Sequence, residues 1–213
     1  SSSLLKDVNL ITAEVITLII NQSLFTGIFP DRLKIAKIVP VFKKDNPHLT
    51  GNYRPISLLP AISKVFEKVI FSQLYSYFDN NNLLYKSQYG FRKGHSCELA
   101  AMEVTDKIFN SLDRKKLPIA LFLDFSKAFD TINHDILINK LEHYGVTGIA
   151  LKWFRSYLTN RKQFVLYKGK TSKESTITTG VPQGSILGPL LFIIYINDIA
   201  KITNKYKFTI YAD

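Results

Sequence analysis

Two short apolar runs of high β propensity each lead to an aspartate: residues 119–123 precede Asp124, and residues 208–211 lie just before Asp213. Such runs are typical of rigid, mostly buried strands. A carboxylate is costly to bury without a partner, and a divalent cation is one such partner. We therefore expect Asp124 and Asp213 to lie at the ends of two strands, where they can share a metal ion.

The rest of the chain mixes strand pairs with amphipathic helices. Periodicity and capping signals such as Pro60 and Ser96 predict helices near residues 7–25, 60–77, 96–112, 131–144, 149–158 and 185–199, and strands near residues 35–42, 53–59, 117–124, 163–168, 172–179 and 207–213. Pro40 lies inside the first of these strands, which we therefore expect at a sheet edge. The mixture of strand pairs and packed helices predicts an α+β fold rather than an alternating parallel-sheet fold.

The charge balance favours a polyanionic partner, because 28 Lys and Arg against 17 Asp and Glu give a net charge of +11. A basic surface that binds nothing is the alternative. The single cysteine, Cys97, excludes an internal disulfide and suits a reducing, intracellular setting. No apolar run approaches the ~20 residues that a membrane helix needs, so no contact with a membrane is expected.

Three segments follow one another in order: LDFSKAFD at residues 123–130, GVPQGSILGPLLF at residues 180–192 and YAD at residues 211–213. They resemble the reverse transcriptase domain of non-LTR, LINE-type (jockey-like) retrotransposons, and the resemblance covers about residues 35–213. It implies a right-hand polymerase, with a fingers-like region and N-terminal helix in residues 1–112 and an incomplete palm in residues 113–213. The family pattern continues to YADD and a thumb, so we expect a fragment, truncated within that motif, without polymerase activity of its own.

The resemblance implies that Asp124 and Asp213 are catalytic and hold two Mg²⁺ ions, for which Mn²⁺ can substitute. Nucleotidyl transfer needs hard carboxylate oxygens that hold metals at the primer 3′-hydroxyl and at the leaving pyrophosphate. Taken alone, an aspartate after a strand is more often a turn residue or a helix cap. Asp130 is expected to be such a cap for the following helix and is left out of the site.

Phe129, Gln183 and Gly184 are expected to contact the incoming deoxynucleotide. Phe129 follows Asp124 where the family pattern has a bulky side chain under the sugar, and an aromatic face there excludes a 2′-hydroxyl. An ordinary core phenylalanine is the alternative. Gly184 lets the backbone approach a ligand closely, and the Gln183 amide can both donate and accept hydrogen bonds at a base pair.

Basic residues supply the remaining candidate contacts. Lys43, Lys44 and Arg54 flank the hairpin expected from residues 35–59, where both arms can present cations to a triphosphate. A solvated basic hairpin is the alternative. Arg92 and Lys93 lie in the segment QYGFRKGH at residues 88–95, whose basic, aromatic and glycine residues suit a loop that follows the RNA template.

We therefore predict an RNA-directed DNA polymerase that adds deoxynucleotides to a DNA primer on an RNA template. A group II intron-type reverse transcriptase and a catalytically inactive, RNA-binding scaffold remain as alternatives. A scaffold has no need for Asp124, Phe129 and Asp213 together. Neither a GxxxxGK[ST] loop nor a GxSxG turn occurs, so a P-loop ATPase or a serine hydrolase has no support.

Overall fold

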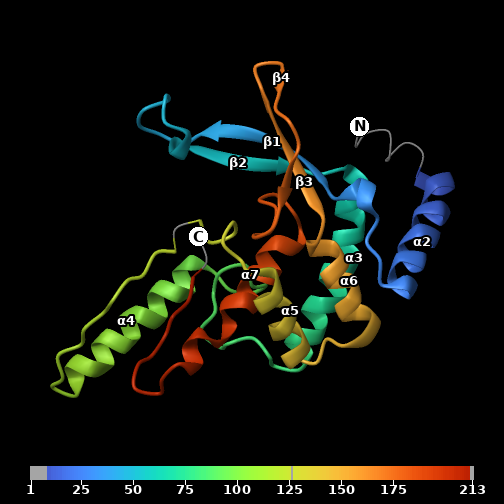
Figure 1. The fold of residues 1–213 in the computed structure, drawn as a ribbon. Helices are drawn as coiled ribbons and strands as arrows, with labels where there is room; N and C mark the ends of the chain where they lie inside the picture. The colour runs from blue at the N-terminus through green and yellow to red at the C-terminus, as the bar shows by residue number, and fades with distance from the viewer. Residues whose placement is uncertain (1–8, 126, 212–213) are drawn as a thin grey trace.

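The computed structural model describes residues 9–125 and 127–211, which form helices packed against a mixed sheet (Figure 1). The helices are α2 (Asn9–Thr26), α3 (Ala61–Asn80), α4 (Cys97–Asp113), α5 (His134–His143), α6 (Gly148–Leu158) and α7 (Leu187–Ile196), with 3₁₀ turns η1 (Asp31–Leu33), η2 (Thr50–Asn52) and η3 (Asn197–Lys201). The strands are β1 (Ile35–Phe42), β2 (Tyr53–Leu58), β3 (Arg161–Tyr167), β4 (Lys170–Thr171) and β5 (Ser175–Ile177). The predicted α+β class is confirmed.

The sheet has the order β2-β1-β3-β4, with β5 also paired to β3. The β1–β2 hairpin is antiparallel as expected, but β1 also pairs with β3 in parallel, so the prediction that β1 is an edge strand is wrong. The pairing with β3 ends at Ile38. Pro40 lies beyond this point, so its missing N–H removes no hydrogen bond to β3.

Helices α3, α5, α6 and α7 pack on one another beside the sheet and bury the main apolar core (Figure 1). Phe29, which is fully buried, lies at an aromatic cluster in this core. Its ring makes edge-on contacts with Phe66, Trp153 and Tyr157, at centroid distances of 5.8, 5.4 and 5.1 Å. Edge-on aromatic pairs stabilise a core beyond the area that they bury. The helices that form this core lie beside the sheet and carry the loops that connect them to it.

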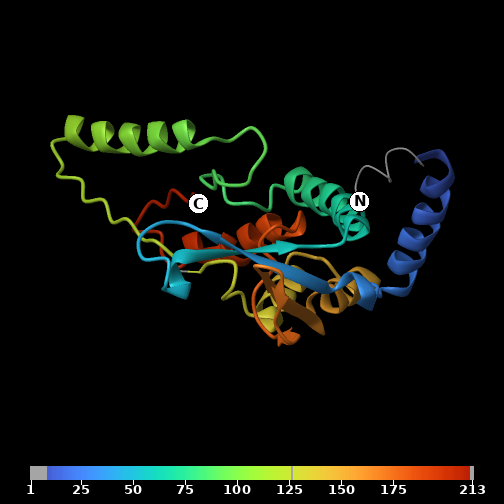
Figure 2. The same cartoon turned by 90° about the horizontal axis from the view of Figure 1, so that it is seen from above.

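The expected strand at residues 117–124 does not form, and this prediction is wrong. The segment has no regular secondary structure and is exposed, with 93% of Leu117 and 96% of Ile119 accessible to solvent. It runs back alongside α4, from the far end of that helix toward the body of the molecule (Figures 1 and 2). A strand requires a neighbour for its backbone N–H and C=O groups, and high β propensity alone does not supply one.

The expected strand at residues 207–213 is also absent from the part that the structure describes. Residues 207–211 form one isolated bridge, in which Ile210 pairs in parallel with Gln88. The Ile210 N–H donates to Ser87 O at 2.8 Å, and Ile210 O accepts from Tyr89 N at 2.8 Å. Residues 87–89 therefore supply the backbone partner of Ile210. Ala212 and Asp213 lie outside the described residues.

Helix α4 extends away from the other helices and gives the molecule a projecting arm (Figure 2). Its start is a local feature of the sequence, because the Ser96 side chain accepts from Leu99 N at 3.3 Å and caps the helix. Over the described ranges, no helix is long and apolar enough to cross a membrane.

Candidate active site

An open cavity of about 1270 Å³ lies between the β1–β2 hairpin, the residues around Asp124 and Phe129, and the turn at residues 182–185. The predicted site residues that line it are Lys43, Arg54, Asp124, Phe129, Gln183 and Gly184. Lys44, Arg92 and Lys93 do not line it, and Asp213 is outside the described residues. The fold thus brings three distant parts of the sequence to one cavity. A smaller cavity of about 520 Å³, between α5 and η3, contains none of the predicted residues.

The hairpin forms one wall of the cavity and carries two of its cations, Lys43 and Arg54. The strand register sets Val41 opposite Arg54, and the Lys43 N–H donates to Asn52 O at 2.9 Å, which continues the ladder past the strand ends. Within residues 9–125 and 127–211, neither Lys43 nor Arg54 forms an ion pair. Their charged groups are therefore available to an anion in the cavity.

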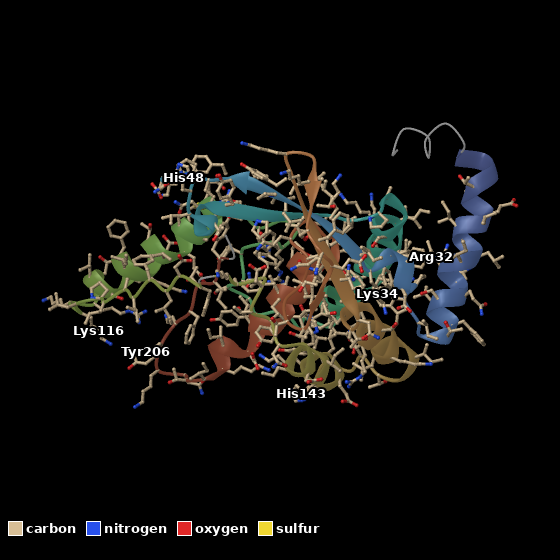
Figure 3. All side chains as sticks on the ribbon, turned by 45° about the horizontal axis from the view of Figure 1, so that its top comes forward. Arg32, Lys34, His48, Lys116, His143 and Tyr206 are labelled. Atoms are coloured by element: carbon tan, nitrogen blue, oxygen red, sulfur yellow. The ribbon has the colours of Figure 1, made fainter. Side chains whose placement is uncertain are left out.

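Asp124 is exposed at the cavity, and no other described residue occupies its carboxylate with a hydrogen bond or an ion pair. Unengaged carboxylate oxygens suit a hard divalent cation. Within the described ranges, no three His, Cys, Asp or Glu side chains gather closely enough to hold a metal. His48, in the hairpin turn, and His143, at the end of α5, lie far apart and do not share a site (Figure 3). Asp124 thus presents a carboxylate to the cavity that has no other partner among the described residues.

Phe129 lines the cavity and is held by two other aromatic rings. The Phe91 ring lies edge-on at a centroid distance of 5.8 Å, and the Phe192 ring of α7 lies at 5.1 Å. The side chain is partly buried. Because its ring is packed on one side and faces the cavity on the other, packing determines how far it projects into the cavity.

The turn that carries Gln183 is bonded to two neighbouring segments. The Gln183 side chain donates from Nε2 to Asp130 Oδ1 at 2.9 Å, and its backbone O accepts from Ser57 N of β2 at 2.7 Å. The prediction that Asp130 caps the next helix is therefore wrong. Asn133 caps α5 instead, since its Oδ1 accepts from Ile136 N at 3.0 Å. The motif around Asp124 and the GVPQG turn are joined by a direct side-chain contact.

Two glycines let this turn lie directly on neighbouring backbone. Gly180 has φ +83°, and a Cβ there would lie 2.7 Å from Asp130 O. Gly184 has φ +116°, and a Cβ there would lie 2.8 Å from Ser57 O. Any other residue at either position would meet backbone atoms and would also be strained. The close approach expected of Gly184 is thus toward β2 as well as toward the cavity.

The sequence interpretation missed several polar residues that also line the cavity: His48, Tyr53, Lys127 and Asp130. Lys127 and Asp130 belong to the LDFSKAFD segment, so their place in that motif was the available signal. His48 and Tyr53 lie in and after the hairpin turn, where no periodicity distinguishes a cavity residue from a solvated one.

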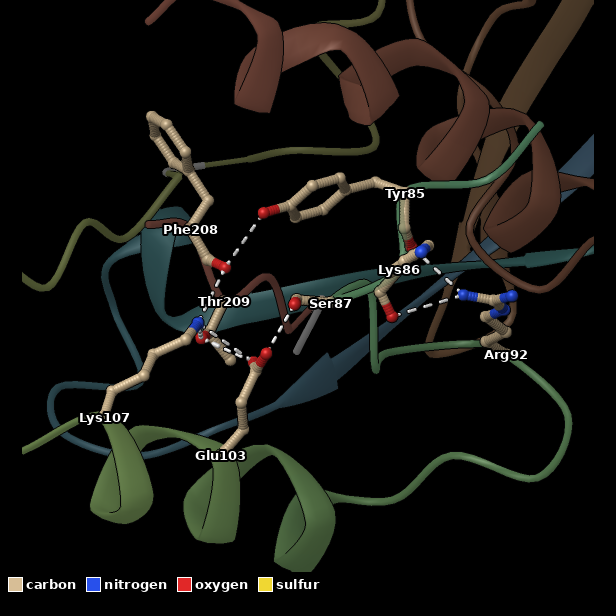
Figure 4. Close-up of polar contacts among 8 residues, drawn as sticks. All are labelled: Tyr85, Lys86, Ser87, Arg92, Glu103, Lys107, Phe208 and Thr209. Carbon is tan, nitrogen blue, oxygen red and sulfur yellow. Dashed lines mark hydrogen bonds and ion pairs between the residues drawn. The ribbon is translucent and has the colours of Figure 1, made fainter. Parts of the chain in front are cut away.

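Arg92 is engaged within its own loop. Its Nη1 donates to Tyr85 O at 3.0 Å and to Lys86 O at 3.5 Å (Figure 4), and its Nη2 lies 4.0 Å from Asp79 Oδ1. The Lys93 N–H donates to the Tyr75 hydroxyl at 3.0 Å. These contacts hold the loop at residues 85–95 against α3. The adjacent Phe91 is the part of this loop that reaches the cavity.

A polar cluster on α4 holds the residues that lead to the YAD motif (Figure 4). Glu103 accepts from Ser87 Oγ at 2.5 Å and from Thr209 Oγ1 at 2.7 Å. Lys107 Nζ donates to Thr209 Oγ1 at 2.8 Å and to Phe208 O at 3.2 Å, and pairs with Glu103 at 3.2 Å. Burial raises the pKa of Glu103, but the hydrogen bonds from Ser87, Thr209 and Lys107 and the Lys107 charge outweigh it and hold that pKa below its ordinary value of 4.5.

Replacing Glu103 by Gln is expected to remove a pH-dependent part of the stability. Because the pKa of Glu103 is lower in the folded state, its stabilisation is present above pH 4.5 and is lost as the pH falls through the lowered pKa. Urea unfolding should show a wild-type advantage of about 1 kcal/mol at neutral pH that shrinks in acid. Thr209→Val, which removes one donor and leaves the carboxylate, should lose only part of this advantage. A difference that does not change with pH would contradict the role of the charge.

Comparison with known proteins identifies the family. A sequence profile described as reverse transcriptase (RNA-dependent DNA polymerase) matches residues 41–213. The chain is 35% identical over 191 residues to "Probable RNA-directed DNA polymerase from transposon BS" of Drosophila melanogaster. The aligned region covers 86% of this chain and 20% of that protein. It is 32% identical over 191 residues to the RNA-directed DNA polymerase from mobile element jockey of the same species, covering 89% of this chain and 21% of that protein. A COX1/OXI3 intron 1 protein of Saccharomyces cerevisiae is 29% identical to the chain over 180 residues. This alignment covers 80% of this chain and 20% of that protein.

The chain spans about one fifth of the length of these relatives. The predicted resemblance to jockey-like retrotransposons is confirmed by relatives from Drosophila mobile elements. The profile covers both LDFSKAFD and GVPQG, the two described motifs that meet at the cavity. The chain therefore belongs to the reverse transcriptase (RNA-dependent DNA polymerase) family.

Proposed function

We propose that this chain acts within an RNA-directed DNA polymerase of the non-LTR retrotransposon type, inside the cell. Residues 1–112 serve as the fingers-like region and residues 113–213 as part of the palm of a right-hand polymerase. The enzyme adds deoxynucleotides to the 3′ end of a DNA primer on an RNA template. The observation that carries this proposal is the cavity that Asp124 shares with Phe129, Gln183 and the hairpin cations.

The incoming deoxynucleotide occupies this cavity. Arg54 offers a bidentate fork and Lys43 a point charge to the triphosphate, with Lys44 next in sequence. Phe129 lies under the sugar, and its ring leaves no room for a 2′-hydroxyl. Gln183 and Gly184 face the nascent base pair. The hydrogen bond from Gln183 to Asp130 orients the glutamine side chain at the cavity wall.

Asp124, together with Asp213, holds two Mg²⁺ ions, or Mn²⁺ in their place. These ions supply the activation of the 3′-hydroxyl and the neutralisation of charge on the leaving pyrophosphate. The exposed and unengaged carboxylate of Asp124 supports this assignment. Little covalent chemistry is left for the protein, whose side chains bind and orient the reactants.

Arg92 and Lys93 are proposed to contact the template. Arg92 Nη1 is bonded to the Tyr85 and Lys86 carbonyls, so phosphate contact falls to its remaining N–H groups. The Lys93 backbone is held by Tyr75, while its side chain is free to follow the RNA. The net charge of +11 supports binding to a polyanion.

An inactive RNA-binding scaffold is the second candidate function, because a basic reverse transcriptase fold can bind RNA without catalysis. An intron-type reverse transcriptase is the nearer enzymatic alternative. The relatives from transposon BS and mobile element jockey, at 35% and 32% identity, support the retrotransposon type.

Primer extension tests the proposal. The purified full-length protein is given a DNA primer annealed to RNA, the four deoxynucleotides and Mg²⁺. We expect extension that stops when EDTA is added and returns when Mg²⁺ is restored. RNA binding without any extension, at saturating Mg²⁺ or Mn²⁺, would support the scaffold and overturn the proposal.

A further inference from the structure

Glu67 of α3 is a fully buried carboxylate placed directly behind the Gln183–Gly184 turn. Its Oε2 accepts a 2.6 Å hydrogen bond from the backbone N–H of Ile186, the residue at which α7 begins. The first N–H groups of a helix have no partner within the helix, and an anion is favoured there. A side chain from a different helix thus accepts a hydrogen bond from a backbone N–H at the start of α7 that would otherwise have no partner within the helix.

The rest of the Glu67 carboxylate is also bonded. Its Oε1 accepts from Tyr157 at 3.2 Å and from Ser63 at 3.3 Å. Burial raises the pKa of Glu67 above its ordinary value of 4.5 and outweighs the Ile186 N–H, the Arg161 charge and the Tyr157 hydroxyl, which act in the opposite direction. A buried carboxylate is costly unless its oxygens are bonded and its charge is balanced. Partners on three separate elements bond the oxygens of Glu67 and offset part of the cost of burying its charge.

Arg161, at the start of β3, supplies the balancing charge. It is fully buried, donates from Nη1 to Tyr157 O at 3.0 Å, and lies over the Tyr157 ring at 4.8 Å. Its Nε and Nη2 have no hydrogen-bond partner among the described residues. A guanidinium held in this way is retained in a core through electrostatic attraction to a nearby anion. Glu67 is that anion.

The Ile186 contact is connected to the cavity through a short stretch of backbone. Ser185 Oγ donates to Pro182 O and accepts from Gly188 N, both at 2.9 Å, so the turn and the first turn of α7 form one unit. On the cavity side, this unit is bonded to Ser57 and Asp130 through Gln183. The turn is therefore held from behind by Glu67 and from the front by β2 and the LDFSKAFD segment.

We propose that Glu67 is a positioning residue: its bond to the Ile186 N–H sets where Gln183 and Gly184 face the cavity, and so sets the affinity for the incoming deoxynucleotide. The inference rests on the proposed function for its kinetic consequence, but not for the contact itself. Glu67 lies behind the turn and does not line the cavity, so it acts through Gln183 and Gly184 and not by touching the substrate.

Three variants of the full-length protein test the inference. Glu67→Met keeps the unbranched shape but removes the acceptor. Glu67→Gln keeps an acceptor without the charge. Ser63→Ala is the matched control, because it removes one bond to the same carboxylate and leaves the Ile186 contact in place.

Hydrogen exchange gives the readout that does not need activity. In Glu67→Met, amides in a peptide covering residues 183–188 should exchange about tenfold faster, since a hydrogen bond to a charged group is lost. Glu67→Gln should fall between this variant and the wild type, and Ser63→Ala should stay within about twofold of the wild type. If Glu67→Met does not fold, the exchange of residues 183–188 in Glu67→Gln alone decides whether Glu67 positions the turn. Exchange in this peptide equal to that of the wild type overturns the inference.

Steady-state primer extension gives the kinetic readout. Glu67→Gln should raise the KM for deoxynucleotide by about tenfold and change kcat by less than about threefold. A lower melting temperature with unchanged KM would show that Glu67 is merely structural and would overturn the inference. If the wild-type protein extends no primer, the proposed function fails, and the exchange of residues 183–188 alone decides the role of Glu67.

Discussion

Asp124→Asn in the full-length protein is expected to lower primer extension by about a thousandfold or more, because a neutral amide cannot replace a carboxylate that holds divalent metal. The affinity for primed RNA should stay within about twofold, since phosphate contacts by Lys and Arg dominate binding. Single-turnover extension and filter binding on the same preparation measure the two quantities.

Asp130→Asn is the matched control for this prediction. Asp130 lines the same cavity, and an asparagine Oδ1 can still accept from Gln183 Nε2. We expect its extension rate to stay within about threefold of the wild type. Near wild-type extension by Asp124→Asn, or an equal loss in Asp130→Asn, would remove Asp124 from the metal site.

Phe129→Val is expected to reduce the preference for deoxynucleotides over ribonucleotides by about 10- to 100-fold. The smaller side chain opens room for a 2′-hydroxyl at the cavity wall, where the aromatic ring now lies. The ratio of kcat/KM for the two substrates, measured on one template, gives the change in free energy directly.

Phe192→Leu separates selection from packing in this experiment. Phe192 supports the Phe129 ring from α7 at 5.1 Å but does not line the cavity. Because leucine keeps an apolar side chain behind the Phe129 ring, this variant should lower the melting temperature and change the substrate ratio much less than Phe129→Val does. If Phe129→Val also lowers stability without changing the ratio, Phe129 is an ordinary core residue.

Local signals in the sequence predicted much of the secondary structure. Ser96 caps α4 as expected, Pro60 directly precedes α3, and the hairpin formed by β1 and β2 lies within a residue of its expected bounds. Each of these signals acts within a short stretch of chain, through a cap, a restricted φ or a loop rich in turn-forming residues. They therefore do not depend on what the rest of the molecule does.

The candidate site was predicted in part. Resemblance to a known family selected Asp124, Phe129 and Gln183, and these residues lie at one cavity. It did not reveal the contact between Gln183 and Asp130, nor the burial of Glu67 behind the turn. Periodicity places Glu67 in a helix but does not distinguish a buried acceptor from a solvated carboxylate, because its partners come from α6 and α7.

By itself, the sequence determined where helices such as α3 and α4 start and which motifs the chain carries, since these depend on the nearest residues. Only the tertiary structure decided which segments pair. Residues 117–124 have strong β propensity but no neighbour, whereas Ile210 pairs with Gln88, which is distant in the sequence. Pairing of distant segments depends on loop closure and on the burial available around each of them, and neither is encoded in the residues of a single strand.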